Sequence, residues 1–318
     1  MSKPLIAVTR RLPPACEQRL ANHYEARPGR DEGSFSREQL LAHGAGADGL
    51  IVTPAEVCDA GLINALPRSI KLISTVSVGY EHIDLDAARQ RGLRVTNTPD
   101  VLTDATADIA LLLLLGASRR ATEGDRILRE GRWPGLRPTF LLGNQITGKR
   151  LGILGMGRIG AAFARRAQAC GMQVLYHNRK PAADSAGATY CGSLEYLLAQ
   201  SDVLSLHAPL TPETKNILNA ARLALLPQGA IVINTARGGL VDDDALIAAL
   251  KSGQVGSAGL DVVAGEPPLH PGYLPRPNVM LLPHLGSATL ETRTAMGMLA
   301  IDNVDAVIGG REPPHPVA

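Results

Sequence analysis

The chain alternates short apolar runs with amphipathic stretches over most of its length. In the first hundred residues, apolar runs that predict strands lie at 5–8, 49–52, 71–75 and 93–96. Stretches with apolar residues at helical spacing separate these runs, at 14–23, 36–42, 60–66 and 85–90. Such alternation is typical of a parallel sheet that helices cover on both faces.

A Pro-containing turn at 97–100 interrupts this rhythm. A longer helix is predicted over 104–119, with Thr103 as its cap, and its run 111–115 is apolar around the whole helix, which predicts burial on more than one side. An irregular stretch at 130–136 carries the only tryptophan, Trp133. A second series follows, with strands near 151–154, 173–176, 202–206, 230–234, 257–261 and 279–282, and with helices such as 159–169 and 243–250.

A glycine turn, Gly155-Met156-Gly157-Arg158-Ile159-Gly160, stands between the strand at 151–154 and the helix at 159–169. This order of strand, turn and helix is typical of a dinucleotide site, because backbone amides and the helix N-terminus then face a pyrophosphate. A Rossmann unit that begins near 150 leaves the first hundred residues to form another domain. The last predicted helix, about 290–308, would return to that domain.

We therefore expect an α/β fold of two Rossmann-like domains with a cleft between them. Residues 1–100 and 288–318 would form a discontinuous, flavodoxin-like substrate domain. Residues 101–287 would form the NAD(P)-binding domain.

Composition narrows the functional classes. The 318 residues are 45% hydrophobic and 19% charged, which suits a soluble globular protein, and a formal net charge of +2 without a basic run argues against nucleic-acid binding. Four cysteines without a C-x-x-C motif, and without histidines at ligand spacing, favour reduced thiols over disulfides or a metal site. No apolar run is long enough for a signal peptide core or a membrane span, so we expect a cytoplasmic protein without a membrane partner.

Three predicted strands are followed by titratable residues: Arg237 after 230–234, Glu266 after 257–261 and His284 after 279–282. Ligands of open α/β sheets bind at the carboxyl ends of the strands, and an Arg fork suits a carboxylate. A glutamate beside His284 would favour the imidazolium, which could protonate a carbonyl oxygen while hydride reaches its carbon. Taken singly, each has a plainer explanation as a loop arginine or a structural histidine.

The residues about twenty positions beyond the glycine turn bear on the choice of cofactor. An acidic residue there would bind the ribose 2′-hydroxyl of NAD, but the chain reads Asn178-Arg179-Lys180. Arg179 and Lys180 would attract a 2′-phosphate, and Asn178 could hydrogen-bond to it, which favours NADPH over NADH. A solvated basic loop is the alternative.

Several motifs together resemble the D-isomer-specific 2-hydroxyacid dehydrogenase family over nearly the whole chain. They are Val76–Asp84, Asn97–Pro99, Gly155–Gly160, Leu206–Leu210, Asn234–Gly238, Gly265–Pro267 and Pro283–His284. The resemblance implies that Arg237 binds the substrate, Glu266 tunes the histidine and His284 is the proton donor.

The resemblance also implies ligand contacts. The substrate would contact Ser77, Val78 and Gly79, besides Arg237 and His284, and a glycine at 79 would let it approach the main chain. The cofactor would contact Thr106, Gly155, Gly157, Arg158, Ile159, Asn178, Arg179, Lys180, His207, Ala208, Pro209, Thr214, Thr235, Ala236, Arg237, Asp261, His284 and Gly286.

The stretch 97–108 is similar to the glyoxylate/hydroxypyruvate reductase and 2-ketogluconate reductase branch. We expect NADPH-preferring reduction of a small 2-oxo acid (glyoxylate, hydroxypyruvate or 2-ketogluconate) to the D-2-hydroxy acid. The alternatives are an NAD-linked dehydrogenase, such as phosphoglycerate dehydrogenase, and a dinucleotide-sensing, corepressor-like interaction protein. Family members pair through their cofactor domains, which implies a homodimer, although Trp133 could instead pack on its own subunit.

Overall fold

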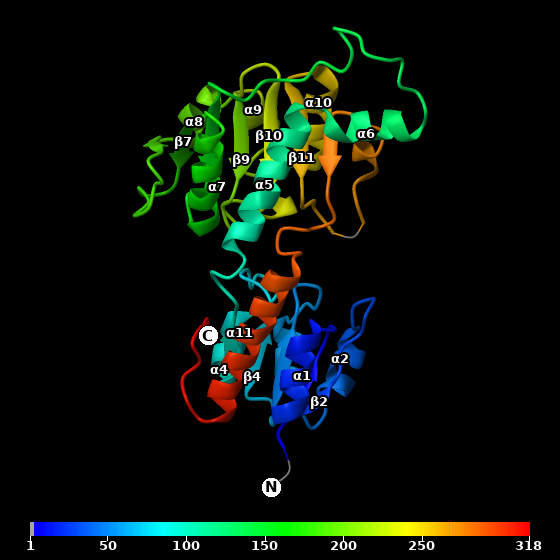
Figure 1. The fold of residues 1–318 in the computed structure, drawn as a ribbon. Helices are drawn as coiled ribbons and strands as arrows, with labels where there is room; N and C mark the ends of the chain where they lie inside the picture. Colours follow the sequence, from blue (N-terminus) through cyan, green and yellow to red (C-terminus); the bar gives the residue numbers. More distant parts are fainter. Residues whose placement is uncertain (1–2, 267) are drawn as a thin grey trace. The chain divides into compact units, whose positions relative to one another are not determined.

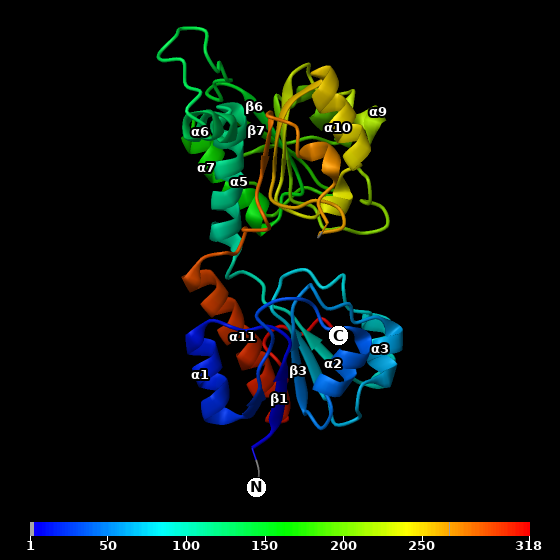
Figure 2. The ribbon, with the colours of Figure 1, turned by 90° about the vertical axis from the view of Figure 1, so that its right-hand side faces the viewer.

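Two parallel β-sheets organise the chain in the computed structural model, which describes residues 3–266 and 268–318. The chain divides into two units, and we name them unit 1 (Met1–Leu102 with Ala288–Ala318) and unit 2 (Thr103–Ser287). In each unit helices cover both faces of one sheet (Figures 1 and 2). The predicted α/β class with two Rossmann-like units is thereby confirmed.

Unit 1 has a five-stranded sheet in the order β2-β1-β3-β4-β5, which is the flavodoxin-like order. Helices α1 and α11 cover one face, and α2, α3 and α4 cover the other. The strands are β1 (Leu5–Val8), β2 (Glu25–Arg27), β3 (Gly49–Val52), β4 (Leu72–Thr75) and β5 (Arg94–Thr96). The helices are α1 (Pro14–His23), α2 (Arg37–His43), α3 (Ala60–Ala65), α4 (Leu85–Arg91) and α11 (Leu290–Ile308).

Side chains at the helix ends explain why the helices of unit 1 begin where they do. Ser36 and Gln39 form a reciprocal capping box at α2, and Asp59 and Asp84 accept backbone amides at the starts of α3 and α4. Beyond α11, residues 315–318 return to pair with β5, since Val95 donates to Ala318 O and Val317 donates to Val95 O (2.8 Å each).

Unit 2 has a seven-stranded sheet in the order β12-β11-β10-β9-β6-β7-β8. Six of these strands follow the Rossmann order, which reverses between β6 and β9. The strands are β6 (Arg150–Leu154), β7 (Gln173–His177), β8 (Thr189–Tyr190), β9 (Val203–Leu206), β10 (Ala230–Asn234), β11 (Val255–Leu260) and β12 (Val279–Leu281).

Helices α5 and α7 pack on one face of this sheet, and α8, α9 and α10 pack on the other. The α-helices are α5 (Thr103–Ser118), α6 (Ala121–Arg129), α7 (Arg158–Ala169), α8 (Leu194–Gln200), α9 (Ala220–Leu223) and α10 (Asp243–Ser252). Two 3₁₀ turns, Gly238–Leu240 and Pro271–Tyr273, follow β10 and precede β12.

The expectation that the 111–115 run is buried on more than one side is wrong. Leu113 and Leu114 are fully buried, but Leu112 and Leu115 are 46% and 41% exposed. Only one side of α5 packs on the sheet and on α7, so the apolar residues on its other side face outward. The α6 helix and the short strands β2 and β8 were not predicted either.

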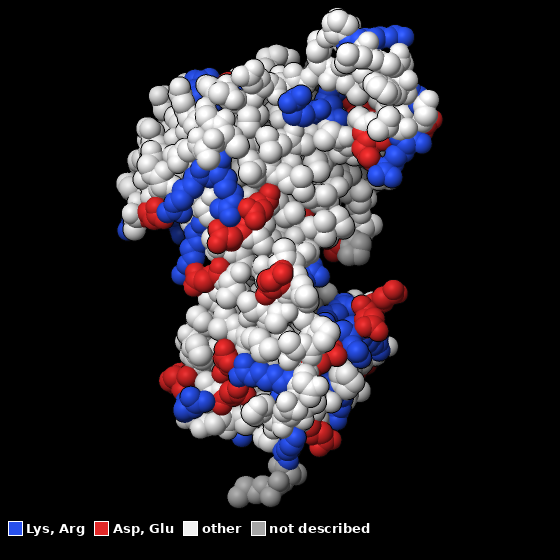
Figure 3. Space-filling view, in the orientation of Figure 1, with Lys and Arg blue, Asp and Glu red and all other residues white. Residues whose placement is uncertain are grey.

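Charges of both signs are interspersed on the face of each unit that Figure 3 shows, so neither face carries a broad field of one sign. Among the described residues, no helix combines the length and apolarity of a membrane span, and no three His, Cys, Asp or Glu side chains converge as metal ligands. The four cysteines are free thiols.

Candidate active site

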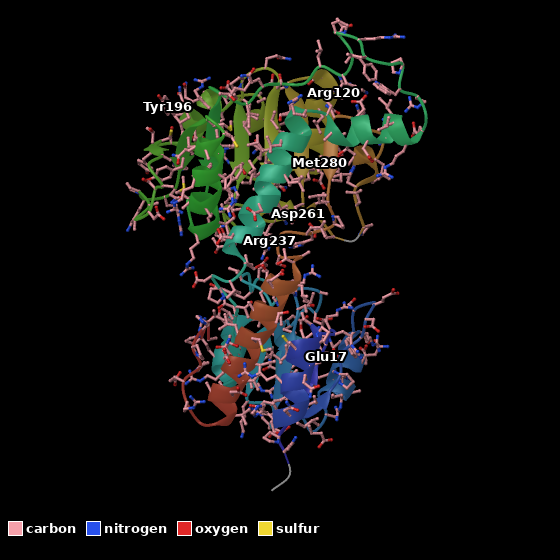
Figure 4. All side chains as sticks on the ribbon, in the orientation of Figure 1. Glu17, Arg120, Tyr196, Arg237, Asp261 and Met280 are labelled. Atoms are coloured by element: carbon pink, nitrogen blue, oxygen red, sulfur yellow. The ribbon has the colours of Figure 1, made fainter. Side chains whose placement is uncertain are left out.

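The predicted site residues of unit 2 gather where strands β6, β9, β10, β11 and β12 end. In Figure 4, Arg237 and Asp261 lie at one end of this unit, whereas Arg120 and Tyr196 lie at the opposite end. The sheet order reverses between β6 and β9, and open α/β sheets bind their ligands at such a switch point.

The glycine turn is built around that switch point. Gly155 has φ +100°, and a Cβ there would lie 2.5 Å from Ala208 N, so the turn and the segment after β9 are in contact. A Cβ on Gly160 would lie 2.5 Å from Gly155 O, whereas a Cβ on Gly157 would meet no atom within 4 Å. Gly155 and Gly160 are therefore required for close packing of the backbone, whereas the space beside Gly157 is open to a ligand.

The N-terminus of α7 suits a phosphate. No side chain caps it at Gly157, and its first turn carries no acidic residue. The amides of a first helical turn have no acceptor within the helix, and the helix dipole adds partial positive charge. These residues fit the pyrophosphate of a dinucleotide.

Asn178 braces the glycine turn from the end of β7. Its Oδ1 accepts Met156 N (2.7 Å), and its Nδ2 donates to Met156 O (3.2 Å). The side-chain oxygen of Asn178 therefore hydrogen-bonds to the glycine turn. The sequence did not indicate this contact. Arg179 and Lys180 are exposed beside Asn178. The pKa of Glu213 is lowered, first by its hydrogen bond from Thr211 and in smaller part by the nearby charge of Arg179.

The loop after β9 holds His207, Ala208, Pro209 and Thr214. The His207 ring packs on Phe163 with 5.5 Å between centroids, its Nε2 lies 2.8 Å from Ser205 Oγ, and burial lowers the pKa of His207 to about 4. Thr214 Oγ1 donates to Pro209 O (2.7 Å) and so closes the loop.

The segment after β10 brings Thr235, Ala236 and Arg237 to the same edge. Thr235 Oγ1 is buried and has no hydrogen-bond partner in the described part of the chain, which suits a hydroxyl that a ligand would satisfy. Arg237 is partly buried, its carbonyl accepts Asn234 Nδ2 (2.9 Å), and its Nη1 donates to Ala236 O (2.7 Å).

His284 and Glu266 are brought together, as the predicted pairing requires. His284 Nδ1 lies 3.0 Å from Glu266 Oε2, and Val263 N donates to Glu266 Oε1 (2.5 Å). The ring is about half exposed. Nδ1 faces Glu266, so Nε2 is the nitrogen that remains to contact a substrate. His284 has φ +55°, a conformation that is uncommon outside glycine and that concentrates at functional sites.

Asp261 holds the loop that carries His284. Its carboxylate accepts Leu285 N (2.6 Å) and Gly286 N (2.8 Å), and its carbonyl accepts His284 N (2.9 Å). Burial raises the pKa of Asp261, while the two amides and the nearby His284 oppose that rise. Thr106 Oγ1 donates to Gly286 O (3.1 Å) and ties the loop to α5. The sequence implied only cofactor contacts for Asp261 and Thr106, and a carboxylate at a strand end was the one feature that suggested more.

In unit 1, the predicted substrate turn Ser77–Gly79 directly follows β4. All three of its carbonyls are bonded: Ser77 O accepts Thr98 N (2.9 Å), Val78 O accepts Asn97 Nδ2 (2.8 Å) and Gly79 O accepts Ser77 Oγ (2.6 Å). The amides of Val78, Gly79 and Tyr80 donate to no described residue. Amides without acceptors are available to donate to an anion.

The sheet order of unit 2 and the glycine turn at its switch point define a dinucleotide-binding protein of the Rossmann type. The chain belongs to the D-isomer-specific 2-hydroxyacid dehydrogenase family, whose NAD-binding domain matches residues 111–286. It is 44% identical to glycerate dehydrogenase of Hyphomicrobium methylovorum over 100% of both chains. It is 41% identical to glyoxylate reductase of Thermococcus onnurineus, over 98% of this chain and 95% of that one.

A solved structure is similar over the whole chain. The NADPH-dependent glyoxylate/hydroxypyruvate reductase of Sinorhizobium meliloti, in complex with NADP and malonate, has a TM-score of 0.89 at 36% identity and covers 100% of this chain and 97% of its own. The predicted family is confirmed. The chain is an oxidoreductase that uses a nicotinamide dinucleotide and acts on D-2-hydroxy acids or their 2-oxo counterparts.

Proposed function

We propose that this enzyme reduces a small 2-oxo acid (glyoxylate, hydroxypyruvate or 2-ketogluconate) to the D-2-hydroxy acid, with NADPH as the preferred cofactor. The observation that carries this proposal is the His284–Glu266 pair, 3.0 Å apart at the carboxyl ends of β11 and β12. The names of the relatives, glyoxylate reductase and glycerate dehydrogenase, support the substrate class.

We assign each residue of the site a role in this reduction. A nicotinamide dinucleotide held at the glycine turn and the start of α7 would supply the hydride that the carbonyl carbon of the acid takes up. Nε2 of the His284 imidazolium gives its proton to the carbonyl oxygen, and Glu266 at Nδ1 stabilises the positive charge that precedes this transfer. Carboxylate recognition is assigned to Arg237 in unit 2 and to the Val78–Tyr80 amides in unit 1.

The NADPH preference rests on the residues after β7. Arg179 and Lys180 are exposed, and no carboxylate stands among residues 177–180 to repel a 2′-phosphate. The glycine turn, the uncapped start of α7 and the unsatisfied Thr235 hydroxyl support binding of the dinucleotide itself.

The decisive experiment is steady-state oxidation of NADPH and NADH with glyoxylate, hydroxypyruvate and 2-ketogluconate. We expect turnover with at least one acid and a higher kcat/KM with NADPH. Turnover only in the oxidative direction with NAD would favour the phosphoglycerate-type alternative. Cofactor binding without any turnover would favour the dinucleotide-sensing alternative. His284→Ala should lower kcat far more than it weakens cofactor binding, and unchanged turnover would remove His284 from proton transfer.

We further propose that the enzyme is a homodimer through unit 2 and that it is cytoplasmic, as its free thiols suit. Leu112, Leu115, Leu128, Trp133, Leu136 and Leu142 are exposed on α5, α6 and the loop after α6. Patches of this kind mark interfaces between proteins. Light scattering after size-exclusion chromatography should give twice the mass of one chain, and a monomer mass would reject the dimer.

A further inference from the structure

The side chain of Asn97 hydrogen-bonds to the turn after β4. The mechanism proposed above gives this side chain no role. Asn97 directly follows β5, is 8% exposed, and donates from Nδ2 to Val78 O at 2.8 Å. Its backbone neighbour Thr98 holds Ser77 O, whereas the Gly79 carbonyl is held by the turn's own Ser77 hydroxyl. Among the described residues, Asn97 is therefore the side chain from outside the turn that hydrogen-bonds to one of its carbonyls.

Because the peptide group is planar, the hydrogen bond from Asn97 to Val78 O also determines where the next amide, Gly79 N–H, points. The carbonyl of Val78 and the amide of Gly79 belong to one planar trans peptide, so they point in opposite directions. Because Asn97 fixes Val78 O on its own side, Gly79 N–H points away from Asn97. That amide donates to no described residue. The orientation of the middle amide of the turn is thus set by one hydrogen bond from Asn97.

The backbone of Asn97 is hydrogen-bonded to the C-terminal part of unit 1. Asn303, fully buried in α11, donates from Nδ2 to Asn97 O (3.1 Å). The same side chain accepts His315 N on its Oδ1 (3.1 Å), and Asn97 N donates to His315 O (3.3 Å). Both ends of the Asn303 amide are satisfied, which fixes its orientation and, through it, the backbone that carries the Asn97 side chain.

We propose that Asn97 is a positioning residue for substrate recognition: through Val78 O it aims the Gly79 amide at the carboxylate of the 2-oxo acid. This inference rests on the proposed function, because it presumes that the turn binds that carboxylate. Asn97 itself does not touch the substrate.

The test compares Asn97→Ala with Asn22→Ala, an exposed asparagine in α1 of the same unit. Losing one well-aimed hydrogen bond to a charged group should raise the KM for glyoxylate about 10- to 100-fold. The kcat should change little, since this bond is made to substrate and transition state alike. The inhibition constant of malonate, as a carboxylate probe, should rise with the KM, whereas the KM for NADPH should not. Asn22→Ala should match the parent enzyme in every constant.

The outcomes separate the two proposals. If the parent enzyme turns over none of the three acids, the proposed function fails. If the parent is active and a folded Asn97→Ala variant keeps its KM and malonate constant, the positioning role fails. Equal losses of kcat and of NADPH binding would indicate a merely structural role and would also overturn it. If Asn97→Ala does not fold, Ser77→Ala releases the Gly79 carbonyl instead, and an unchanged KM there refutes the idea that held carbonyls aim the amides.

Discussion

Replacing Asp261 with asparagine should destabilise the ordered conformation of the loop that carries His284, while the rest of unit 2 stays folded. The Asp261 carboxylate accepts Leu285 N at 2.6 Å and Gly286 N at 2.8 Å. In Asp261→Asn, Oδ1 can accept only one of these amides, and Nδ2 places a donor against the other. The change therefore turns one charge-assisted bond into a neutral one and leaves one buried amide without an acceptor.

The magnitude follows from these two bonds. A hydrogen bond to a charged group contributes about 1.5–3 kcal/mol, and a buried unsatisfied donor costs about 1–3 kcal/mol. Burial raises the pKa of Asp261, so the neutral asparagine recovers part of this loss by avoiding a buried charge. We expect the ordered state of the loop to lose about 2–4 kcal/mol in net terms.

Hydrogen exchange and kinetics would measure this loss. Amide exchange in a peptide that covers residues 281–289 should accelerate about 30- to 1,000-fold, the kinetic equivalent of 2–4 kcal/mol. The kcat should fall about 100-fold, because a displacement of His284 by about 1 Å already has an effect of that order. The matched control is Asp242→Asn, at a carboxylate that accepts a single amide, Ala245 N, where asparagine caps a helix equally well. Normal exchange over 281–289 together with a normal kcat in Asp261→Asn would refute the reasoning.

Four further predictions concern cofactor binding, stability and pH. Gly157→Ala should change the unfolding free energy by less than about 1 kcal/mol yet raise the KM for NADPH and NADH, because its methyl enters open space where a phosphate would approach. Gly155→Ala should instead destabilise the protein by more than about 3 kcal/mol in urea titrations, because φ is +100° and Ala208 N would lie 2.5 Å from the new Cβ. Because the pKa of His207 is lowered from 6.5 to about 4, its stabilising contribution is present above pH 6.5, and about 2–3 kcal/mol is lost as the pH falls toward 4. The double variant Arg179→Asp, Lys180→Ala should raise the KM for NADPH about 10- to 100-fold relative to that for NADH.

The following outcomes would contradict three of these predictions. A Gly157→Ala enzyme with unchanged cofactor KM values would show that no phosphate approaches that glycine. His207→Gln should flatten the loss of stability at low pH, although His43, whose pKa burial also lowers, keeps part of it. A slope equal to that of the parent would dismiss the His207 assignment. Equal changes for both cofactors in the double variant would mean that Arg179 and Lys180 do not read the phosphate.

The sequence predicted the architecture well because its strands are short, apolar and evenly separated by helices. The strands at 5–8 and 49–52, the glycine turn and the last helix were predicted close to their observed bounds. The exposed side of α5 could not be predicted from its composition, because an all-apolar helix does not reveal which side packs on a sheet. Likewise, α6 is strongly charged and none of its residues is buried, so no core position marked it as a helix.

The sequence indicated which residues follow the strand ends of the candidate site, but not which residues hold them in place. Titratable residues that follow three strands indicated the His284–Glu266 pair, since the carboxyl ends of parallel strands share one edge. Asp261, Asn178 and Asn97 act by bonding to backbone atoms of distant segments. Such bonds leave no spacing in the sequence, because their partners become neighbours only after the sheets form.

The return of the chain to unit 1 has a consequence for synthesis on the ribosome. Ile6, Val8 and Leu72 on one face of the unit 1 sheet pack against Ile301 and Val304 of α11. All five strands of that sheet are made before unit 2, but α11 and residues 315–318 are made after it. The part of the apolar sheet face that α11 covers, and the edge of β5, therefore stay uncovered while unit 2 is translated, whereas α1 already covers the rest of that face. During this interval the nascent chain exposes apolar surface and an unpaired strand edge, the features that recruit chaperones.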